Sequence, residues 1–375
     1  MEVVTPESFA GFAASLAAAA SDGRSVRILG GGSKPWAAPA SDDALVLGTG
    51  RLDWTVEHTP GDMTAVFAAG VPFARAQAEL ALEGQRLALD PPLGLDDRAT
   101  IGGIVATGDS GPLAHRYGTP RDQVLGVTVA LSDGTIARSG SRVIKNVAGY
   151  DLPKLYAGSF GTLGAILAVG LRLRALPRAT ATILGGVADP DVLAGAVAYL
   201  AKAPFELEAL DVAWRSGRGG VLAQVAGTAA TRRADEVAFA MRDCGLGTID
   251  IADDDGEFWE RQRGLQRSDT RAVVLVTGPR TALPSVLRLA DLHDATMVGR
   301  GGVGASYLTV DPEQVETLRA ALPVGLHAVV LDRPAGAELD TWGVARGPEI
   351  ELMRAVKAQF DPAGVCNSGL MVGGI

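Results

Sequence analysis

Residues 143–166 read VIKNVAGYDLPKLYAGSFGTLGAI, a run that places four glycines among apolar residues. The glycines are Gly149, Gly158, Gly161 and Gly164. Each glycine inside regular structure costs roughly 0.5–1 kcal/mol of stability relative to alanine. The run therefore predicts that another group approaches this backbone so closely that side chains would obstruct it.

Composition places the chain among well-folded globular proteins. It has 375 residues, of which 47% are hydrophobic and 21% are charged. That length predicts two or three domains. The net charge of −9 argues against nucleic acid or an anionic membrane as a partner, because both are normally bound by a basic surface.

The N-terminus and the two cysteines favour a cytoplasmic protein. The N-terminus lacks the basic cluster of a secretory signal and instead reads as an amphipathic helix, with Thr5 as the expected cap and Pro6 in its first turn. No apolar run approaches the ~20 residues of a transmembrane helix. Cys244 and Cys366 form no metal-binding or CxxC pattern, so we expect free thiols and no metal site.

The first half of the chain alternates short strands with glycine-rich loops. We expect a helix over 72–84, between a proline and a glycine, and a β-hairpin over 124–140 that turns at Asp133 and Gly134. The remaining expected strands are 25–29, 44–48, 63–70 and 165–176.

The rhythm changes after Pro177. Residues 180–251 read as strand, helix, strand, strand, helix, strand, and residues 273–331 repeat this order. Two such units predict one antiparallel sheet with helices on one face, in an α+β protein. The tail from about Thr341 holds one helix and a loop, and it is too short to form a domain. We therefore expect a domain over 1–177, a cap domain over 178–340, and a tail over 341–375 that returns to the first domain.

Three further segments share the glycine-rich character of the opening stretch. The first, GGGSK at 30–34, follows a strand, but prolines at 35 and 39 exclude the helix that a Rossmann loop requires. It reads equally well as a nest of N–H groups for phosphate and as a plain glycine turn. The others are DPPLGLDDRATIGGIVATGDSGP at 90–112 and CNSG at 366–369, and the former suits either a large flat ligand or tight packing.

Together the four segments resemble the FAD-binding domain of the vanillyl-alcohol oxidase and para-cresol methylhydroxylase (PCMH) superfamily. Within it they are similar to the FAD-binding E subunit of the bacterial glycolate oxidase, or glycolate dehydrogenase, complex. That family carries GGG-[ST]-K, DPP, ATIGG, SGP and KNVAGYD…GTLG in this order, and so does this chain. The resemblance covers about residues 25–177 and the last twenty or so, whereas the cap domain shares only its general architecture.

The resemblance implies that FAD lies extended across a PCMH-type domain over 1–177. Gly30 to Lys34 would bind the pyrophosphate, and Asn367 would close the site from the tail. The full set of implied FAD-binding residues is Gly30, Gly31, Gly32, Ser33, Lys34, Thr100, Gly102, Gly103, Ala106, Ser110, Gly111, Arg121, Asp122, Lys145, Asn146, Gly149, Tyr150, Asp151, Gly161, Ile166 and Asn367.

The resemblance also sets expectations about chemistry. Relatives that tether FAD covalently carry a histidine beside the phosphate loop, and residues 25–40 have none, so we expect non-covalent FAD. His115 follows the SGP segment and suits either a place near the flavin or a solvent-facing loop. The catalytic D subunit carries a histidine-rich motif in its cap, whereas this chain has no paired histidines there. Its cap arginines read more readily as a solvated, salt-bridged surface than as substrate contacts; they are Arg261, Arg263, Arg267, Arg271 and Arg300.

Two functions from different classes remain open. The chain is either a flavin dehydrogenase that oxidises glycolate or a similar 2-hydroxy acid to the 2-oxo acid, or a non-catalytic FAD-carrying subunit that supports assembly or electron flow. A stand-alone FAD-dependent alcohol or hydroxy-acid oxidoreductase is a third option. By resemblance, the partners are a sister FAD subunit and an iron–sulfur subunit, through which the cytoplasmic chain could attach to the inner membrane. No catalytic residue is identified from the sequence.

Overall fold

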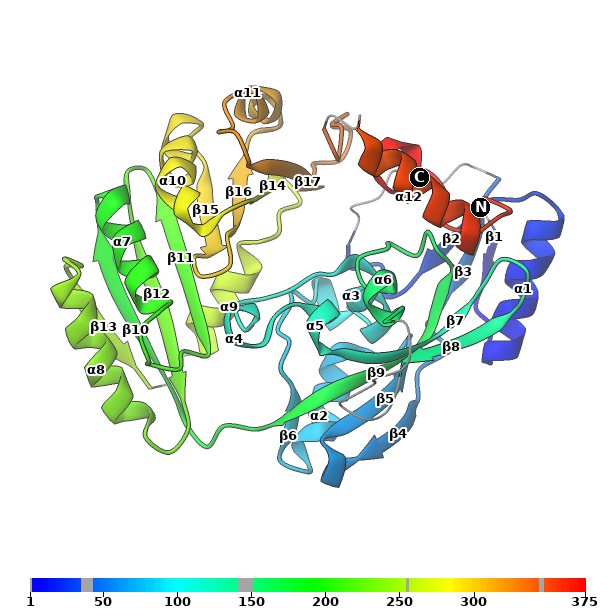
Figure 1. Cartoon of the computed structure of the whole chain (residues 1–375), viewed down its shortest axis with the longest axis horizontal. Coiled ribbons are helices and arrows are strands. Elements are labelled where there is room, and N and C mark those ends of the chain that lie inside the picture. The colour runs from blue at the N-terminus through cyan, green and yellow to red at the C-terminus, as the bar shows by residue number, and fades with distance from the viewer. Residues whose placement is uncertain (1, 35–42, 141–150, 254–255, 344–346) are drawn as a thin grey trace.

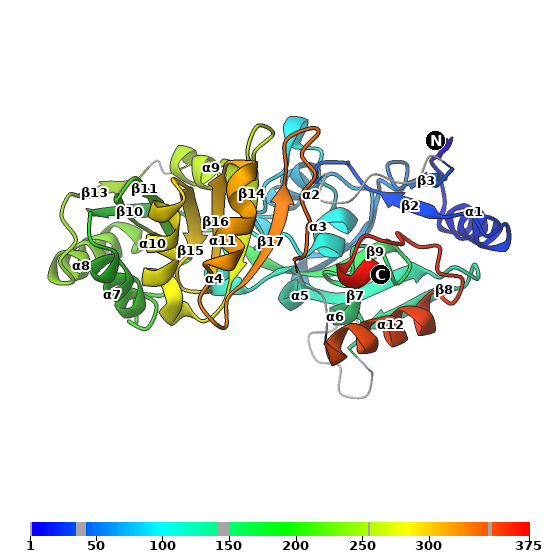
Figure 2. The ribbon, with the colours of Figure 1, turned by 90° about the horizontal axis from the view of Figure 1, so that it is seen from above.

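The computed structural model describes residues 2–34, 43–140, 151–253, 256–343 and 347–375. Figure 1 shows two bodies side by side, with the cap sheet on the left and the N-terminal strands on the right. Figure 2, from above, shows the same order along the long axis of the molecule. The chain passes between the bodies at the end of strand β9 (Ala175) and the start of β10 (Thr180). The domain boundaries at 177 and 340 stay a prediction.

The N-terminal body contains a small parallel sheet covered by helix α1 (Phe9–Ser21). Phe12 and Leu16 of α1 are fully buried, as their shared helical face predicts. The expected cap at Thr5 was wrong: the helix begins later, and the Ser8 hydroxyl accepts the N–H of Gly11 at 3.1 Å. The strands lie in the order β1 (Glu2–Val4), β3 (Leu45–Gly48), β2 (Val26–Leu29).

A six-stranded antiparallel sheet forms the rest of the N-terminal body. The expected hairpin is present as β7 (Val124–Ala130) and β8 (Ile136–Gly140), and Gly134 in its turn has a φ of +85°. Leu47, Phe67 and Leu167 belong to one buried core shared by the two sheets. The other strands are β4 (Thr55–Thr59), β5 (Thr64–Ala68), β6 (Gln85–Leu87) and β9 (Ala165–Ala175). The helices are α2 (Phe73–Ala81), α3 (Ile101–Thr107), α4 (Ala114–Tyr117), α5 (Pro120–Gln123) and α6 (Pro153–Tyr156).

The cap is one eight-stranded antiparallel sheet, and both predicted strand–helix units contribute to it. Its order is β13 (Ile249–Ala252), β10 (Thr180–Val187), β12 (Arg218–Ala226), β11 (Ala209–Arg215), β15 (Thr296–Arg300), β16 (Ala305–Val310), β14 (Ala272–Thr277), β17 (His327–Asp332). The helices are α7 (Pro190–Leu200), α8 (Ala230–Asp243), α9 (Gly256–Gly264), α10 (Leu283–Leu292) and α11 (Val315–Ala320). Helices α7, α8, α10 and α11 cover one face of the sheet (Figure 1).

The opposite face of the cap sheet carries polar groups and is turned towards the N-terminal body. Side chains alternate between the two faces of a strand, so Val298 and Arg300 of β15 share one face. Val298 pairs with Tyr307 on β16 and with Ala213 on β11, so these two residues lie on the same face. Asp211 lies two residues before Ala213 and therefore shares this face as well. Phe160 of the N-terminal body packs against Val298 and Tyr307 here.

The tail returns to the N-terminal body after α12 (Pro348–Phe360). Its segment around Cys366 runs parallel to the start of β2, where Val26 donates its N–H to the carbonyl of Val365 at 2.8 Å. Figure 2 shows α12 on the side of the N-terminal body where α6 and β8 lie.

Candidate functional site

The GGGSK loop is glycine-rich chiefly because it packs against the backbone of residues 98–103. An added Cβ on Gly31 would lie 1.5 Å from the carbonyl oxygen of Arg98, and one on Gly30 would lie 2.6 Å from the Thr100 hydroxyl. Gly32 has a φ of +65°, a conformation that side chains disfavour. The loop therefore leaves its main chain without side-chain cover on the side that faces helix α3.

The ATIGG motif forms the start of α3 opposite this loop. The Thr100 hydroxyl caps the helix by accepting the N–H of Gly103 at 3.2 Å. Gly102 lies so close to Ala69 that an added Cβ would be 2.6 Å from the Ala69 Cβ. Small residues thus let the first turn of α3 lie against the end of β5 and face the glycine loop.

Asn367 of the tail joins the glycine loop to the GSFGTLG segment. Its side-chain oxygen accepts the N–H of Ile28 at 2.7 Å, and its side-chain nitrogen donates to the carbonyl of Phe160 at 2.6 Å. Gly161 follows with a φ of +72°, and an added Cβ there would lie 2.7 Å from the Asn367 amide nitrogen. The Asn367 side chain therefore fixes the three segments to one another, and Gly161 leaves room for it.

These segments line one cavity, with an empty volume of about 870 Å³ that includes its open mouth. Gly-lined walls and the apolar Ile166 and Phe160 fit a large flat ligand. The predicted residues that line it are Gly30, Gly31, Gly32, Ser33, Lys34, Thr100, Gly102, Gly103, Ala106, Gly161, Ile166 and Asn367. The lining residues that the sequence did not indicate are Arg27, Ile28, Leu29, Thr49, Ala69, Thr107, Phe160 and Leu370. Arg27, Ile28 and Leu29 belong to β2, the strand that leads into GGGSK, so their place in the lining follows from that strand. No sequence pattern indicates that Phe160 and Thr49 line a cavity.

The other predicted residues lie apart from this lining or outside the described residues. Asp122 accepts the N–H of Thr119 at 2.8 Å and so caps helix α5, while Arg121 donates to the carbonyl of Lys154 at 3.3 Å. Asp151 is exposed just before α6. Ser110 and Gly111 contact the cap instead. Lys145, Asn146, Gly149 and Tyr150 lie outside the described residues. A role of all these residues in cofactor binding stays a prediction.

Lys34 is buried and paired. Its ammonium lies 3.3 Å from the carboxylate of Asp109, and both side chains are at least 95% buried. Burial lowers the pKa of Lys34, although the neighbouring Asp109 opposes that effect. A positive charge in this position is already compensated, so we expect the main-chain N–H groups of the loop to serve as donors for an anionic ligand.

A second group of buried charges lies where the cap sheet meets the N-terminal body. Burial opposes the charge of Arg300, but Tyr307, Asp211, Asp90 and Asp109 together raise its pKa. Burial in turn raises the pKa of Asp90 to about 7 and that of Asp211 to about 6. An arginine surrounded by several carboxylates compensates their charge, and it is a poor anchor for a further anion.

The cap arginines that could have bound a substrate carboxylate mostly have protein partners. Arg267 pairs with Asp332 at 2.7 Å and Arg271 pairs with Asp311 at 2.9 Å. Arg263 lies 3.7 Å from Asp90. Arg300 donates to a main-chain carbonyl, whereas Arg261 is exposed on α9. The salt-bridged interpretation therefore fits these side chains better than substrate contact does.

The histidines lie away from the cavity that the described residues form. His115 is half-buried against the β15–β16 turn, where an added Cβ on Gly302 would lie 2.3 Å from its ring. Burial, then the nearby arginines, lowers its pKa. His58 contacts Gln85, His293 contacts Gln314, and His327 is exposed on β17. Among the described residues, no group of three or more His, Cys, Asp or Glu side chains could hold a metal ion.

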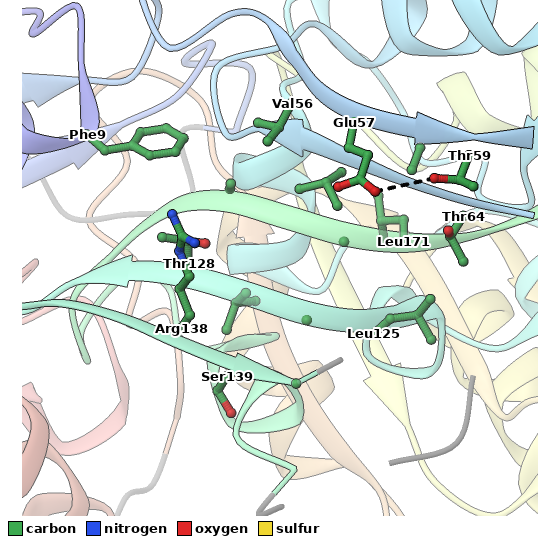
Figure 3. Close-up of a pocket in the computed structure, with 17 residues that line it drawn as sticks. Phe9, Val56, Glu57, Thr59, Thr64, Leu125, Thr128, Arg138, Ser139 and Leu171 are labelled. Atoms are coloured by element: carbon green, nitrogen blue, oxygen red, sulfur yellow. Dashed lines mark hydrogen bonds between the residues drawn. The ribbon is translucent and has the colours of Figure 1, made fainter. Parts of the chain in front are cut away.

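A second hollow lies on the face of the six-stranded sheet beside α1 (Figure 3). Apolar side chains such as Phe9, Val56 and Leu171 line it, together with Arg138 and Glu57. The Thr59 hydroxyl donates to the Glu57 carboxylate at 3.4 Å. None of the predicted site residues in the described part of the chain lines this hollow.

Comparison with known proteins identifies the fold and the cofactor. Residues 2–140 match the FAD binding domain family. Glycolate oxidase subunit GlcE of Escherichia coli is 28% identical over 320 residues, which is 84% of each chain. Glycolate oxidase subunit GlcD of Bacillus subtilis is 32% identical over 174 residues, which is 46% of this chain and 37% of that protein. The solved structure of an alkyldihydroxyacetonephosphate synthase superposes with a TM-score of 0.73 over 97% of this chain and 76% of that one, at 15% identity.

Three predictions are thereby confirmed. The fold is α+β with a PCMH-type FAD-binding domain, the resemblance to the E subunit of glycolate oxidase holds, and FAD is the cofactor. The similarity supports the prediction of an FAD-dependent oxidoreductase, and whether this chain is catalytic by itself stays a prediction. Within the part of the chain that the structure describes, no helix is both long and apolar enough to cross a bilayer.

Proposed function

We propose that this chain is the FAD-binding subunit of a multi-subunit complex that oxidises glycolate, or a similar small 2-hydroxy acid, to the 2-oxo acid. The observation that carries the proposal is the cavity that GGGSK, ATIGG, Gly161 and Asn367 form together. The similarity to GlcE, which extends over 84% of both chains, supports the substrate class.

Within this cavity the chain's own residues would hold the cofactor. The main chain of Gly30 to Ser33 would meet the pyrophosphate, and Ile166 with Phe160 would line the apolar part. When bound, FAD supplies a two-electron acceptor. The described residues that line the cavity include no histidine or cysteine, which supports non-covalent binding.

We further propose that a sister FAD subunit carries the chemical step and that an iron–sulfur subunit receives the electrons. Oxidation of a 2-hydroxy acid needs a base for the hydroxyl proton and a cation for the carboxylate. In the described part of the cap, Arg267, Arg271 and Arg300 are engaged by protein groups, and the histidines are not paired with one another. This observation favours the FAD-carrying role over a complete active site in this chain. The complex would be cytoplasmic and would reach the inner membrane only through its partners.

The test compares the isolated chain with the reconstituted complex. Under anaerobic conditions, glycolate and D-lactate should bleach the flavin absorption of the isolated chain very slowly, because general-base catalysis typically contributes about 10²–10⁴-fold. Adding the sister and iron–sulfur subunits should produce turnover, and the same two subunits without this chain serve as the control. Rapid full bleaching of the isolated chain would show that it has its own active site. No turnover by the complete complex would refute the substrate class.

A further inference from the structure

Two cap arginines donate to main-chain carbonyls of the N-terminal body, one in the cavity wall and one in the loop over 109–111 that follows α3. Arg300 is 1% exposed, and it donates to the carbonyl of Gly111 at 2.9 Å and to that of Ser110 at 2.5 Å. The same guanidinium donates to the side-chain oxygen of Gln266 at 2.8 Å. A planar guanidinium can serve several acceptors in fixed directions, which a flexible ammonium cannot.

The surroundings of Arg300 fix its charge and its direction. Its guanidinium carbon lies 4.7 Å from the centre of the Tyr307 ring, on the neighbouring strand of the cap. Asp90, Asp109 and Asp211 contribute negative charge around it. An incoming carboxylate would meet that negative charge, so Arg300 is suited to holding the loop over 109–111 and not to binding substrate.

The second arginine, Arg267, contacts the phosphate loop. Arg267 follows α9, and it donates to the carbonyl of Ser33 in the phosphate loop at 3.0 Å. Its direction is set by Asp332 at the end of β17, which accepts from it at 2.7 and 3.0 Å. Between the two contacts, Lys34 pairs with Asp109 and so joins the phosphate loop to the loop that Arg300 holds.

We propose that Arg267 and Arg300 are positioning residues for the cofactor. Arg267 holds Ser33 in the cavity wall, and Arg300 holds the loop over 109–111, which the Lys34–Asp109 pair ties to that wall, so that docking of the cap sheet sets the affinity for FAD. On this view the cap of this chain stabilises the loops that form the cofactor site. The proposal concerns cofactor binding alone and does not depend on which substrate the complex oxidises.

The experiment measures FAD affinity in full-length apoprotein by quenching of flavin fluorescence. Arg300→Lys keeps the positive charge near Asp90, Asp109 and Asp211, but it loses the planar guanidinium whose N–H groups point in fixed directions. Loss of one net hydrogen bond predicts about fivefold weaker FAD binding. Arg267→Lys should weaken binding by a similar factor. Arg271→Lys is the matched control, because Arg271 pairs with Asp311 inside the cap and touches neither loop.

Two further measurements distinguish a positioning role from a purely structural one. They are thermal unfolding of the apoproteins and the shape of the absorption spectrum of the bound flavin. We expect weaker binding and an altered spectrum in the Arg300 and Arg267 variants, with apoprotein unfolding close to that of Arg271→Lys. Wild-type affinity in both variants, or an equal loss in Arg271→Lys, would overturn the proposal. If Arg300→Lys fails to fold, Arg267→Lys decides alone, since its side chain is 18% exposed and therefore tolerant. Normal FAD binding by wild type without hydroxy-acid turnover would instead count against the proposed function only.

Discussion

Gly161 links the local backbone to the cofactor cavity. Its φ of +72° lies in the left-handed region, and it lies between Phe160 and the Asn367 amide. That amide cannot move aside, because it donates to the Phe160 carbonyl and accepts from the Ile28 N–H. The residue is therefore constrained both by backbone conformation and by space.

Gly161→Ala should abolish or strongly weaken FAD binding, since the new Cβ would lie 2.7 Å from the Asn367 nitrogen. Flavin content after purification measures the effect. Gly158→Ala is the matched control: Gly158 has a φ of +80°, but an added Cβ meets nothing within 4 Å. Both variants should lose roughly 1–2 kcal/mol of stability from the left-handed backbone. Full flavin content in Gly161→Ala would show that this segment does not border FAD.

Asp90 gives the stability of the protein a defined pH dependence. Burial raises its pKa to about 7, against the opposing charges of Arg263 and Arg300 and the N–H of Leu113, while Asp211 adds to the rise. Because the folded-state pKa lies above the unfolded value, the native state retains the proton longer. The contribution of protonated Asp90 to the free energy of unfolding is therefore complete at low pH and is lost as the pH rises through about 7.

Asp90→Asn should accordingly gain stability relative to wild type as the pH rises from about 5 to about 8, by on the order of 2 kcal/mol. Urea unfolding of both proteins at the two pH values measures this difference. The asparagine oxygen can still accept the N–H of Leu113, so the fold should be kept. An equal stability difference at both pH values would contradict the assigned pKa.

At the scale of elements, one buried lysine fixes the tail to the GTLG segment. The ammonium of Lys357 donates to the carbonyls of Thr162 and Cys366 and to the carboxylate of Asp361, each at 2.7 Å. Asp361 also accepts the N–H of Cys366 at 2.8 Å. These contacts place the following residue, Asn367, in the cavity wall.

Lys357→Met should lower the free energy of unfolding by about 3–5 kcal/mol, because it leaves the Asp361 carboxylate buried without its partner. FAD affinity should fall with it, since Asn367 loses its support. Chemical denaturation and flavin titration measure the two effects. Lys202→Met removes an exposed lysine and should change neither. Wild-type stability of Lys357→Met would mean that the tail is held by its other contacts.

At the scale of the whole molecule, the two bodies meet through polar contacts and through Phe160, which also lines the cofactor cavity. The cap face that carries Arg300 and Tyr307 contacts the loop over 109–111, and Arg267 of the cap contacts Ser33 in the cavity wall. Asn367 and Leu370 of the tail line the cavity itself. FAD held in this way would be enclosed by segments from the N-terminal body and the tail.

Acid precipitation of the holoprotein should release all flavin into the supernatant. The described residues that line the cavity offer no histidine or cysteine for a covalent link, and His115 lies against Gly302 in the cap. The flavin absorption of supernatant and washed pellet measures the partition. Flavin that stays in the pellet would demonstrate a covalent bond.

The sequence indicated most strands of the N-terminal body, the antiparallel cap sheet and, through the family resemblance, the glycine-rich segments that line one cavity. The reason is that hydrophobic periodicity and turn residues act over a few neighbouring positions, as at the Asp133–Gly134 hairpin. The family resemblance, and not these local signals, indicated Gly161 and Thr100, which the structure places in the cavity wall. The local signals misplaced the cap of α1, where Thr5 and Ser8 are both of a preferred capping type, and they did not indicate β1, β4 or β6.

Only the tertiary structure decided which charged and polar groups meet. Ile28 and Asn367 are 339 positions apart, and Ser110 and Arg300 are 190 apart. A sequence pattern indicates which face of an element is buried, but it does not name the partner across the interface. Lys34 thus reads as a phosphate ligand from its motif, and it is paired with Asp109 in the structure. Long-range docking selects such partners, because a buried charge must be compensated by whatever group the fold brings within reach.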